Sequence, residues 1–208
     1  MNSSGDKLIY LRWEDNINYF PNIKKHLLRF KEILEDQAKR YEENYPWFAL
    51  HRPREQWVFE TQAKILVPYR CKSNIFGYST KPLYSSRDVL FITEKDTSTS
   101  LKYVLALLNS RLYYFWLYRK GKRKGETLEL VWQPLSEIPI KQISRTDQKP
   151  FISIADQILT ITKDEDYLSN LSKQARVKEL ERQIDQLVYQ LYGLTPEEIA
   201  VVEGSSKK

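Results

Sequence analysis

The sequence holds very few of the side chains from which metal and catalytic sites are often built. Its 208 residues include one cysteine, Cys71, and two histidines, His26 and His51, which are 25 positions apart. These three residues offer no zinc-ligand spacing, so we predict no metal site. A single thiol cannot form a disulfide within the chain and suits a reducing compartment, so we expect a cytoplasmic protein.

Glycine is also scarce, and the motifs that depend on it are missing. The six glycines form no GxGxxG or GxxxxGK[ST] run, which excludes the standard dinucleotide and phosphate cradles. No GxSxG sequence supports a serine nucleophile either. No apolar run approaches the length of a transmembrane helix, so we expect no membrane partner. We therefore predict that this chain is not an enzyme by itself; an enzyme with an unfamiliar site is the alternative.

Positive charge is present in excess, and it is unevenly distributed. Lysine and arginine number 33 against 27 aspartates and glutamates, which gives a net charge of +6. Between Asp164 and Glu203, however, nine acids outnumber four bases. The excess therefore lies in the first three quarters of the chain, where it favours an anionic partner.

The charge is densest directly after an apolar stretch. Residues 101–120 carry apolar side chains at a spacing of three to four and contain no proline or glycine, so we expect one amphipathic helix. Gly121 and Gly125 bracket what we expect to be a flexible loop. Nucleic acid is the natural partner of such a loop, and a solvated turn is the alternative. The loop and the helix end supply five candidate DNA-binding residues: Arg119, Lys120, Lys122, Arg123 and Lys124.

The rest of the chain predicts an α+β fold. Pro21 opens a helical pattern that continues to Tyr41, residues 47–94 contain short strand-like runs, and residues 128–132 alternate like a strand. We expect a small, aromatic-rich mixed sheet flanked by helices. The predicted strands include 57–59 and 64–70, and the tryptophans predicted to lie in the core are Trp47, Trp57, Trp116 and Trp132.

The C-terminal part reads as helical from Pro150 onward. One helix ends at Gly193, and Thr195 to Glu198 form a capping box for the last helix. The polar stretch 144–149 suggests a boundary, so we expect an α+β domain over residues 1–145 and a helical region, 146–208, that packs on it. The apolar seam from Leu180 to Leu191 is barely two heptads long, which favours a monomer over a dimer.

Further candidates for DNA contact lie before the basic loop. Arg52 and Arg54 flank Pro53, and an arginine fork suits a phosphate or the edge of guanine. An internal ion pair with Glu55 or Glu60 is an equally good interpretation of both. Weaker candidates follow the predicted strands: Arg70, Lys72, Tyr78, Tyr84 and Arg87.

Several motifs in order carry a family resemblance that spans about residues 8–203. They are Trp47 with residues 51–55, residues 64–70, 107–110, 114–116, 121–125, 135–140 and 184–199. With these motifs the chain resembles the TaqI-like C-terminal specificity domain of adenine-specific DNA methyltransferases, found in type II restriction–modification enzymes. A helix with Leu-Asn-Ser, a glycine-containing loop and an Ile-Pro-Ile segment are also similar to type I specificity subunits.

The resemblance implies a division of labour between this chain and a catalytic domain. The family's catalytic half carries an Asn-Pro-Pro-Tyr/Phe motif and a glycine-rich S-adenosylmethionine motif, and both are absent here. A methyltransferase domain in the same or a partner chain is thus expected to bind S-adenosylmethionine and flip the adenine, while this chain binds no cofactor. This chain is expected to recognise a sequence in double-stranded DNA. A protein-interaction module with an incidental basic loop is the competing interpretation.

Overall fold

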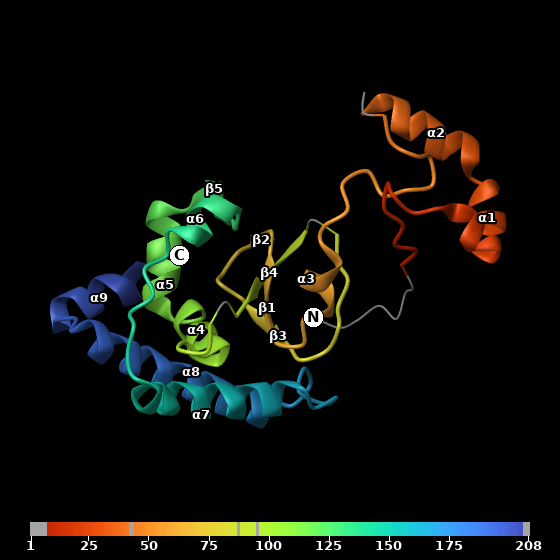
Figure 1. Ribbon diagram of the computed structural model, residues 1–208. Coiled ribbons are helices and arrows are strands. Elements are labelled where there is room, and N and C mark those ends of the chain that lie inside the picture. Colours follow the sequence, from red (N-terminus) through yellow and green to blue (C-terminus); the bar gives the residue numbers. More distant parts are fainter. Residues whose placement is uncertain (1–7, 42–43, 87, 95, 206–208) are drawn as a thin grey trace. The chain divides into compact units, whose positions relative to one another are not determined.

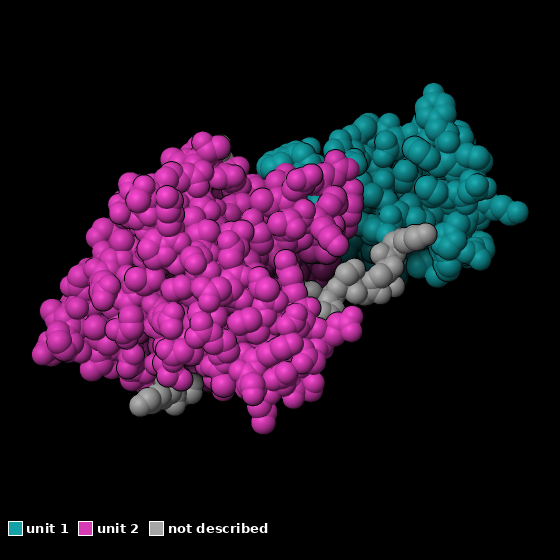
Figure 2. Space-filling view, turned by 90° about the horizontal axis from the view of Figure 1, so that it is seen from below, with its two compact units in different colours: residues 1–59 teal, residues 60–208 magenta. Residues whose placement is uncertain are grey.

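A computed structural model describes residues 8–41, 44–86, 88–94 and 96–205 of the chain (Figure 1). The chain forms two compact units, residues 1–59 and residues 60–208 (Figure 2). Within the described ranges, no helix is both long and apolar enough to cross a membrane. The mixture of helices with two small antiparallel sheets confirms the predicted α+β class.

Unit 1 is mainly helical. It holds the short 3-10 helix η1 (Ile17–Tyr19), α1 (Pro21–Leu28), α2 (Lys31–Arg40) and most of α3 (Gln56–Glu60). The single helix predicted from residue 21 to 41 is wrong, because Arg29 and Phe30 separate α1 from α2. The strand predicted at 57–59 is also wrong, because those residues belong to α3.

Unit 2 contains two three-stranded antiparallel sheets. In the first, β1 lies between β3 and β4, and its Ile65 and Val67 are fully buried. In the second, β6 lies between β2 and β5. The strands are β1 (Lys64–Pro68), β2 (Arg70–Cys71), β3 (Gly77–Ser79), β4 (Val89–Thr93), β5 (Lys122–Lys124) and β6 (Thr127–Glu129).

The apolar stretch after residue 100 forms two helices, α4 (Leu101–Leu108) and α5 (Arg111–Lys120), so the single helix predicted over 101–120 is wrong. The break lies at Asn109 and Ser110. The Asn109 side chain accepts a hydrogen bond from the Phe76 N–H at 2.9 Å and donates to the Phe76 carbonyl at 3.1 Å. Ser110 donates to the Leu107 carbonyl at 2.7 Å. These side chains compete with the helical backbone, which redirects the chain without glycine or proline.

Four further helices complete unit 2: α6 (Trp132–Ser136), α7 (Arg145–Thr162), α8 (Leu171–Tyr192) and α9 (Pro196–Ser205). Gly193 adopts a left-handed conformation (φ 67°) after α8, as predicted for a C-terminal cap. The capping box before α9 is confirmed as well, because the Thr195 N–H donates to Glu198 Oε2 at 2.8 Å and the Glu198 N–H to Thr195 Oγ1 at 3.3 Å.

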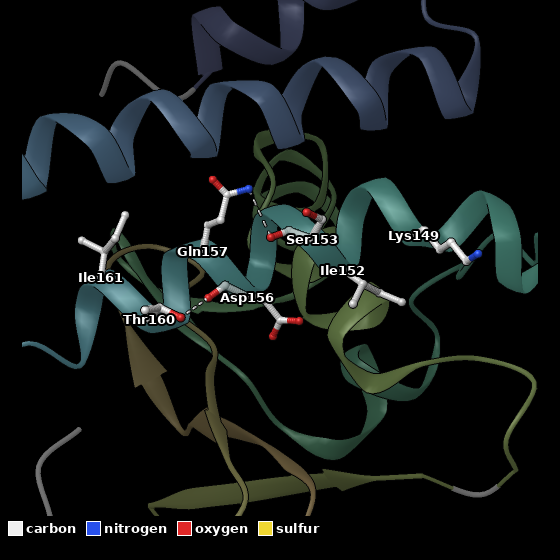
Figure 3. A pocket seen from close by; sticks show the side chains of 7 residues that line it. All are labelled: Lys149, Ile152, Ser153, Asp156, Gln157, Thr160 and Ile161. Atoms are coloured by element: carbon white, nitrogen blue, oxygen red, sulfur yellow. Dashed lines mark hydrogen bonds between the residues drawn. The ribbon is translucent and has the colours of Figure 1, made fainter.

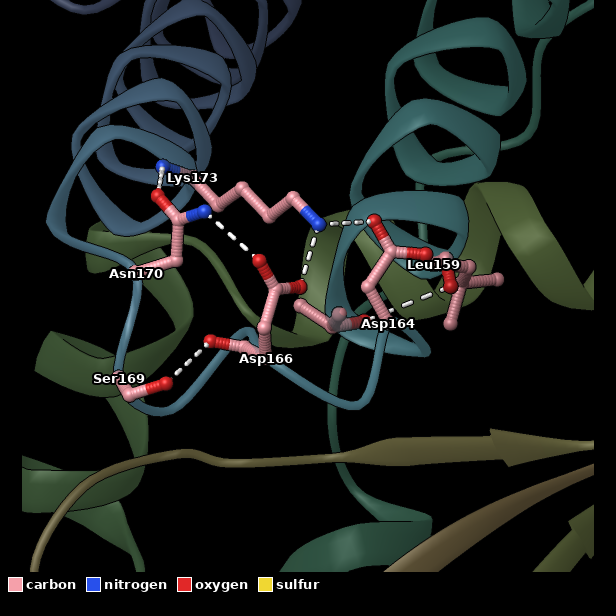
Figure 4. Close-up of polar contacts among 7 residues, drawn as sticks. Leu159, Asp164, Asp166, Ser169, Asn170 and Lys173 are labelled. Carbon is pink, nitrogen blue, oxygen red and sulfur yellow. Dashed lines mark hydrogen bonds and ion pairs between the residues drawn. The ribbon is translucent and has the colours of Figure 1, made fainter.

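The side chain of Lys173 ties together the turn between α7 and α8 (Figure 4). Lys173 Nζ lies 2.7 Å from Asp164 Oδ2 and also pairs with Asp166. Asn170 donates to Asp166 at 2.8 Å and accepts from the Lys173 N–H at 3.1 Å, which begins α8. The turn therefore holds α7 and α8 as an antiparallel pair.

Two of the tryptophans predicted to lie in the core are exposed instead. Trp132 at the start of α6 is 79% exposed. Trp57 is likewise 56% exposed. The polar stretch 144–149 belongs mostly to α7, because Ser144 accepts from the Asp147 N–H and caps the helix before Pro150.

The helices after residue 145 share one core with the rest of unit 2. Helix α7 packs against α4 and α8, and Phe151, Ala155, Ile184 and Val188 belong to the same buried cluster as Leu107. The contacts thus divide the chain between residues 59 and 60, whereas the sequence suggested a boundary between 145 and 146.

Candidate nucleic-acid interface

The basic segment forms an ordered hairpin instead of the flexible loop expected from its glycines. It leaves α5 at Gly121, runs along β5, turns at Gly125 (φ 61°) and returns as β6. The Gly121 N–H donates to the Leu117 carbonyl at 2.8 Å, and a Cβ at Gly121 would lie only 2.4 Å from that oxygen. The chain therefore passes from α5 into β5 without a loop, at a position where a side chain larger than that of glycine would clash with α5.

Strand pairing divides the cations of the hairpin between two faces. Across from β6, Lys122 pairs with Glu129, Arg123 with Leu128 and Lys124 with Thr127. Because successive side chains of a strand point to opposite faces, Lys122 and Lys124 share one face and Arg123 lies on the other. On the far side of β6, Arg70 also pairs with Glu129, so it joins Lys122.

We call the first of these surfaces the lysine face and define it by Arg70, Lys122 and Lys124. Its centre is Glu129, which is 5% exposed. Arg70 donates from Nε and Nη2 to Glu129 Oε1 at 3.1 and 2.8 Å, and Lys122 Nζ lies 3.2 Å from Oε2. Hydrogen bonds from Lys122 and Arg70 lower the pKa of Glu129, so this carboxylate is ionised at neutral pH.

The opposite surface, which we call the arginine face, is defined by Arg119 and Arg123. Arg123 Cζ lies 4.1 Å from the centre of the Tyr118 ring, and Arg119 Cζ lies 5.5 Å from that of Phe115. These cation–π contacts hold the guanidinium groups against α5. Beside them is a pocket of about 510 Å³, lined by Tyr114, Tyr118, Arg119, Arg123, Ala200, Val201 and Gly204.

Helix α9 contributes small and apolar residues to that pocket, and none of its three acids lines it. Glu203 pairs with Arg111 at the start of α5, at 3.9 Å. In the part of the chain that the structure describes, Arg119, Lys120, Arg123 and Lys124 form no ion pair with a carboxylate. All four are exposed, so the end of α5 and the hairpin together present charge that the described acids do not neutralise.

The weaker candidates for DNA contact that the structure describes in unit 2 lie on or shortly after β2 and β3. Lys72 is exposed directly after β2, close in sequence to Arg70. Tyr78 lies on β3 with its ring 5.9 Å from Lys102 Nζ, and the Tyr84 hydroxyl donates to Glu60 at 3.3 Å. Arg87 lies outside the described residues.

Arg52 and Arg54 belong to unit 1. Arg54 Cζ lies 4.9 Å from the centre of the Phe59 ring, burial lowers its pKa, and its carbonyl accepts a hydrogen bond from the Tyr10 hydroxyl. Glu55, one of the acids considered as a partner, pairs with Arg12 at 3.7 Å. DNA contact by Arg52 and Arg54 stays a prediction.

A second pocket lies along α7 and includes no predicted contact residue (Figure 3). It has a volume of about 590 Å³, and its Asp156 forms an ion pair with Lys102 at 2.5 Å. Within the described ranges, no three histidine, cysteine, aspartate or glutamate residues are grouped as a metal ion would require. The lining residues are Lys149, Ile152, Ser153, Asp156, Gln157, Thr160 and Ile161.

Comparison with known proteins identifies the class of this chain. Residues 12–140 match the TaqI-like C-terminal specificity domain, and they include both sheets and the basic hairpin. Because this match covers more than half of the chain, the chain belongs to that family of specificity domains, which confirms the resemblance.

The relatives are type II methyltransferases. The chain is 30% identical over 173 residues to M.HindII of Haemophilus influenzae (strain ATCC 51907 / DSM 11121 / KW20 / Rd), covering 74% of this chain and 30% of that protein. It is 30% identical over 168 residues to M.HincII of Haemophilus influenzae, covering 74% and 31%. With M.MjaIV of Methanocaldococcus jannaschii it shares 27% identity over 189 residues, covering 86% and 60%. The chain thus spans under a third of the two Haemophilus proteins.

Proposed function

We propose that this chain recognises the target sequence in double-stranded DNA for a restriction–modification methyltransferase that modifies adenine. The observation that carries the proposal is the ordered hairpin with its exposed, unneutralised cations. Support comes from the family of specificity domains and from relatives that are type II methyltransferases. Adenine as the modified base follows from the family resemblance.

The hairpin suits the major groove of DNA in size and charge. That groove admits a two-stranded β-ribbon, and its base edges distinguish all four base pairs. We assign phosphate contacts to Lys72, Lys120 and Lys124, because all three are exposed and none pairs with a described acid. Phosphate contacts supply affinity and register, and the residues that reach base edges supply sequence preference.

The methylation chemistry belongs, in this proposal, to a catalytic domain in the same or a partner chain. The relatives extend well beyond the segment that matches this chain. A stacked base is sterically blocked, so the catalytic domain flips it and supplies S-adenosylmethionine. This chain then contributes recognition and no catalytic group, acts in the cytoplasm and is monomeric.

Salt dependence of DNA binding tests the proposal. A variant with Lys72, Lys120 and Lys124 changed to alanine is compared with the wild-type chain on duplex DNA between low and moderate salt. The slope of log K against log salt is negative, and each lost phosphate contact makes it shallower by about 0.9. Three lost contacts are therefore expected to make it shallower by about 2.7. Fluorescence anisotropy with a labelled duplex measures the slope.

The matched control removes three exposed lysines from the C-terminal helical region: Lys149, Lys163 and Lys178. Its net charge equals that of the test variant, and its slope is expected to stay at the wild-type value. Equal slopes for both variants, or no affinity of the wild-type chain for any duplex at low ionic strength, contradict the proposal. If the wild-type chain has no affinity for duplex DNA and instead forms a complex with a protein through its C-terminal helices, the protein-interaction module is favoured.

A further inference from the structure

We propose that Glu129 is a positioning residue for sequence recognition. In this inference, which rests on the proposed function, Glu129 holds Arg70 and Lys122 in fixed directions on the lysine face. The two cations then discriminate between base sequences, instead of only attracting the DNA backbone.

The position of Glu129 in the sheet supports this role. Glu129 lies on the middle strand, where it is the register partner of Arg70 on one side and of Lys122 on the other. One carboxylate oxygen accepts both hydrogen bonds from Arg70, and the other oxygen faces Lys122. A single buried carboxylate therefore fixes one cation from each neighbouring strand.

Fixing these side chains before DNA binds has a physical consequence. Arginine and lysine lose much rotamer freedom when they are ordered, and this entropy cost otherwise falls on the binding step. Arg70 is also held by the ring of Tyr69, 5.1 Å from its Cζ. Arg70 and Lys122 keep side-chain exposures of 51% and 63%, so both remain accessible to DNA.

Glu129 does not read bases itself, because only 6% of its side chain is exposed. Two simpler roles predict different behaviour. If Glu129 only reduces the positive field, its neutralisation strengthens binding to every duplex equally. If it only stabilises the sheet, neutralisation lowers the melting temperature and weakens binding to every duplex. A positioning role predicts a change in the ratio of specific to non-specific affinity.

The chain offers a matched pair of variants, Glu129→Gln and Glu126→Gln. Glu126 lies in the same hairpin, is exposed and accepts a hydrogen bond from the Tyr118 hydroxyl at 3.3 Å. Both substitutions remove one negative charge, but only the first removes the partner of Arg70 and Lys122. The preferred sequence of the wild-type 208-residue chain is first selected from a random duplex library. The affinity of each variant for that duplex and for a scrambled duplex is then measured at one salt concentration.

We expect both variants to bind the scrambled duplex more tightly than the wild-type chain does. Only Glu129→Gln is expected to lower the ratio of specific to scrambled affinity, by roughly 10-fold, the scale of one good side-chain contact to a base. Thermal unfolding followed by circular dichroism establishes that both variants are folded. If Glu129→Gln does not fold, Arg70→Lys replaces it, because lysine keeps the charge and loses the fork; the same fall in the ratio is expected.

Equal ratios for Glu129→Gln and Glu126→Gln overturn this inference and leave the proposed function intact. An unchanged ratio in Arg70→Lys, where that variant is needed, overturns it as well. If the library yields no preferred sequence for the wild-type chain, the proposed function and this inference both fall.

Discussion

The two sheets of unit 2 have the same number of strands and the same antiparallel pairing, yet the side chains of their central strands differ in burial and charge. In the sheet β3-β1-β4, the central strand buries Ile65 and Val67 completely. In the sheet β2-β6-β5, the central strand buries Leu128 but pairs Glu129 with cations on both neighbours. Both sheets contribute to one core, since Leu128 belongs to the same buried cluster as Ile65 and Val67, but the second sheet also gathers cations around a carboxylate on its other face.

The difference shows that backbone pairing alone does not assign a role to a small sheet. Strand β5 consists of Lys122, Arg123 and Lys124, and it lies at the edge of its sheet. Charged side chains on an edge strand discourage pairing with the edges of other chains. The cations that we assign to DNA binding therefore also protect an open edge.

The largest effect expected from this comparison is on stability. Ile65→Ala removes a fully buried side chain from the central strand of the first sheet. Such truncations lower the free energy of unfolding by about 2–5 kcal/mol, because they lose apolar burial and leave a cavity. Denaturant unfolding measures the change. Ile75→Ala is the control, since Ile75 is 65% exposed and its loss is expected to cost less than about 0.5 kcal/mol.

Two buried acids of unit 2, Glu129 on β6 and Asp185 on α8, differ in the direction of their pKa shifts. Glu129 on the second sheet has a lowered pKa, whereas burial raises the pKa of Asp185 on α8 to about 6. Asp185 accepts from the Arg111 N–H at 2.8 Å, and its Oδ2 lies 3.3 Å from Arg111 Nε. Arg111 lowers this pKa by less than burial raises it, while Glu181 and Glu203 raise it further.

The raised pKa of Asp185 gives a stability change with a defined sign. The folded chain binds this proton more tightly than the unfolded chain, whose aspartate has a pKa of about 3.9. The contribution of Asp185 is therefore fully present below about pH 4 and is lost as the pH rises to about 6, by on the order of 2–3 kcal/mol. The difference in unfolding free energy between wild type and Asp185→Asn is expected to fall over that window. A constant difference from pH 4 to 7 would show that Asp185 titrates normally.

The smallest effect on stability is expected at the surface of the second sheet. Lys124→Ala is expected to change the free energy of unfolding by less than about 0.5 kcal/mol, because Lys124 is exposed and has no described acidic partner. The same variant should reduce the salt slope of DNA binding by about 0.9, the contribution of one phosphate contact. If Lys124→Ala lowered the free energy of unfolding as much as Ile65→Ala does, the expected difference in stability between the two sheets would be contradicted.

The features that the sequence predicts well are local ones. The end of α8 at Gly193 and the capping box at Thr195 depend on residues within one helical turn, so their signals are complete in a short stretch. The cations at 119–124 were also evident from the sequence. Their division between two faces was not, because it follows from pairing with β6.

The features that the sequence missed depend on distant partners. The break after α4 is held by hydrogen bonds between Asn109 and Phe76, 33 positions away. Glu129 and Arg70 are 59 positions apart and meet only when β2 pairs with β6. The alternation that suggested a strand to Trp132 ends at Glu129 in the structure, where α6 follows and leaves Trp132 exposed.

The two-residue period of β5 has a consequence for how related chains can diverge. Point replacements at positions 122 and 124 alter the outward chemistry while the contact between Arg123 and Tyr118 is preserved. A one-residue insertion before position 122 would instead shift the register of β5 and move each of its side chains to the opposite face of the sheet. Both the lysine face and the contact between Arg123 and Tyr118 would then be lost. If the proposed function holds, substitutions in β5 can change the side chains offered to DNA, whereas a change in length by one residue would disturb both faces.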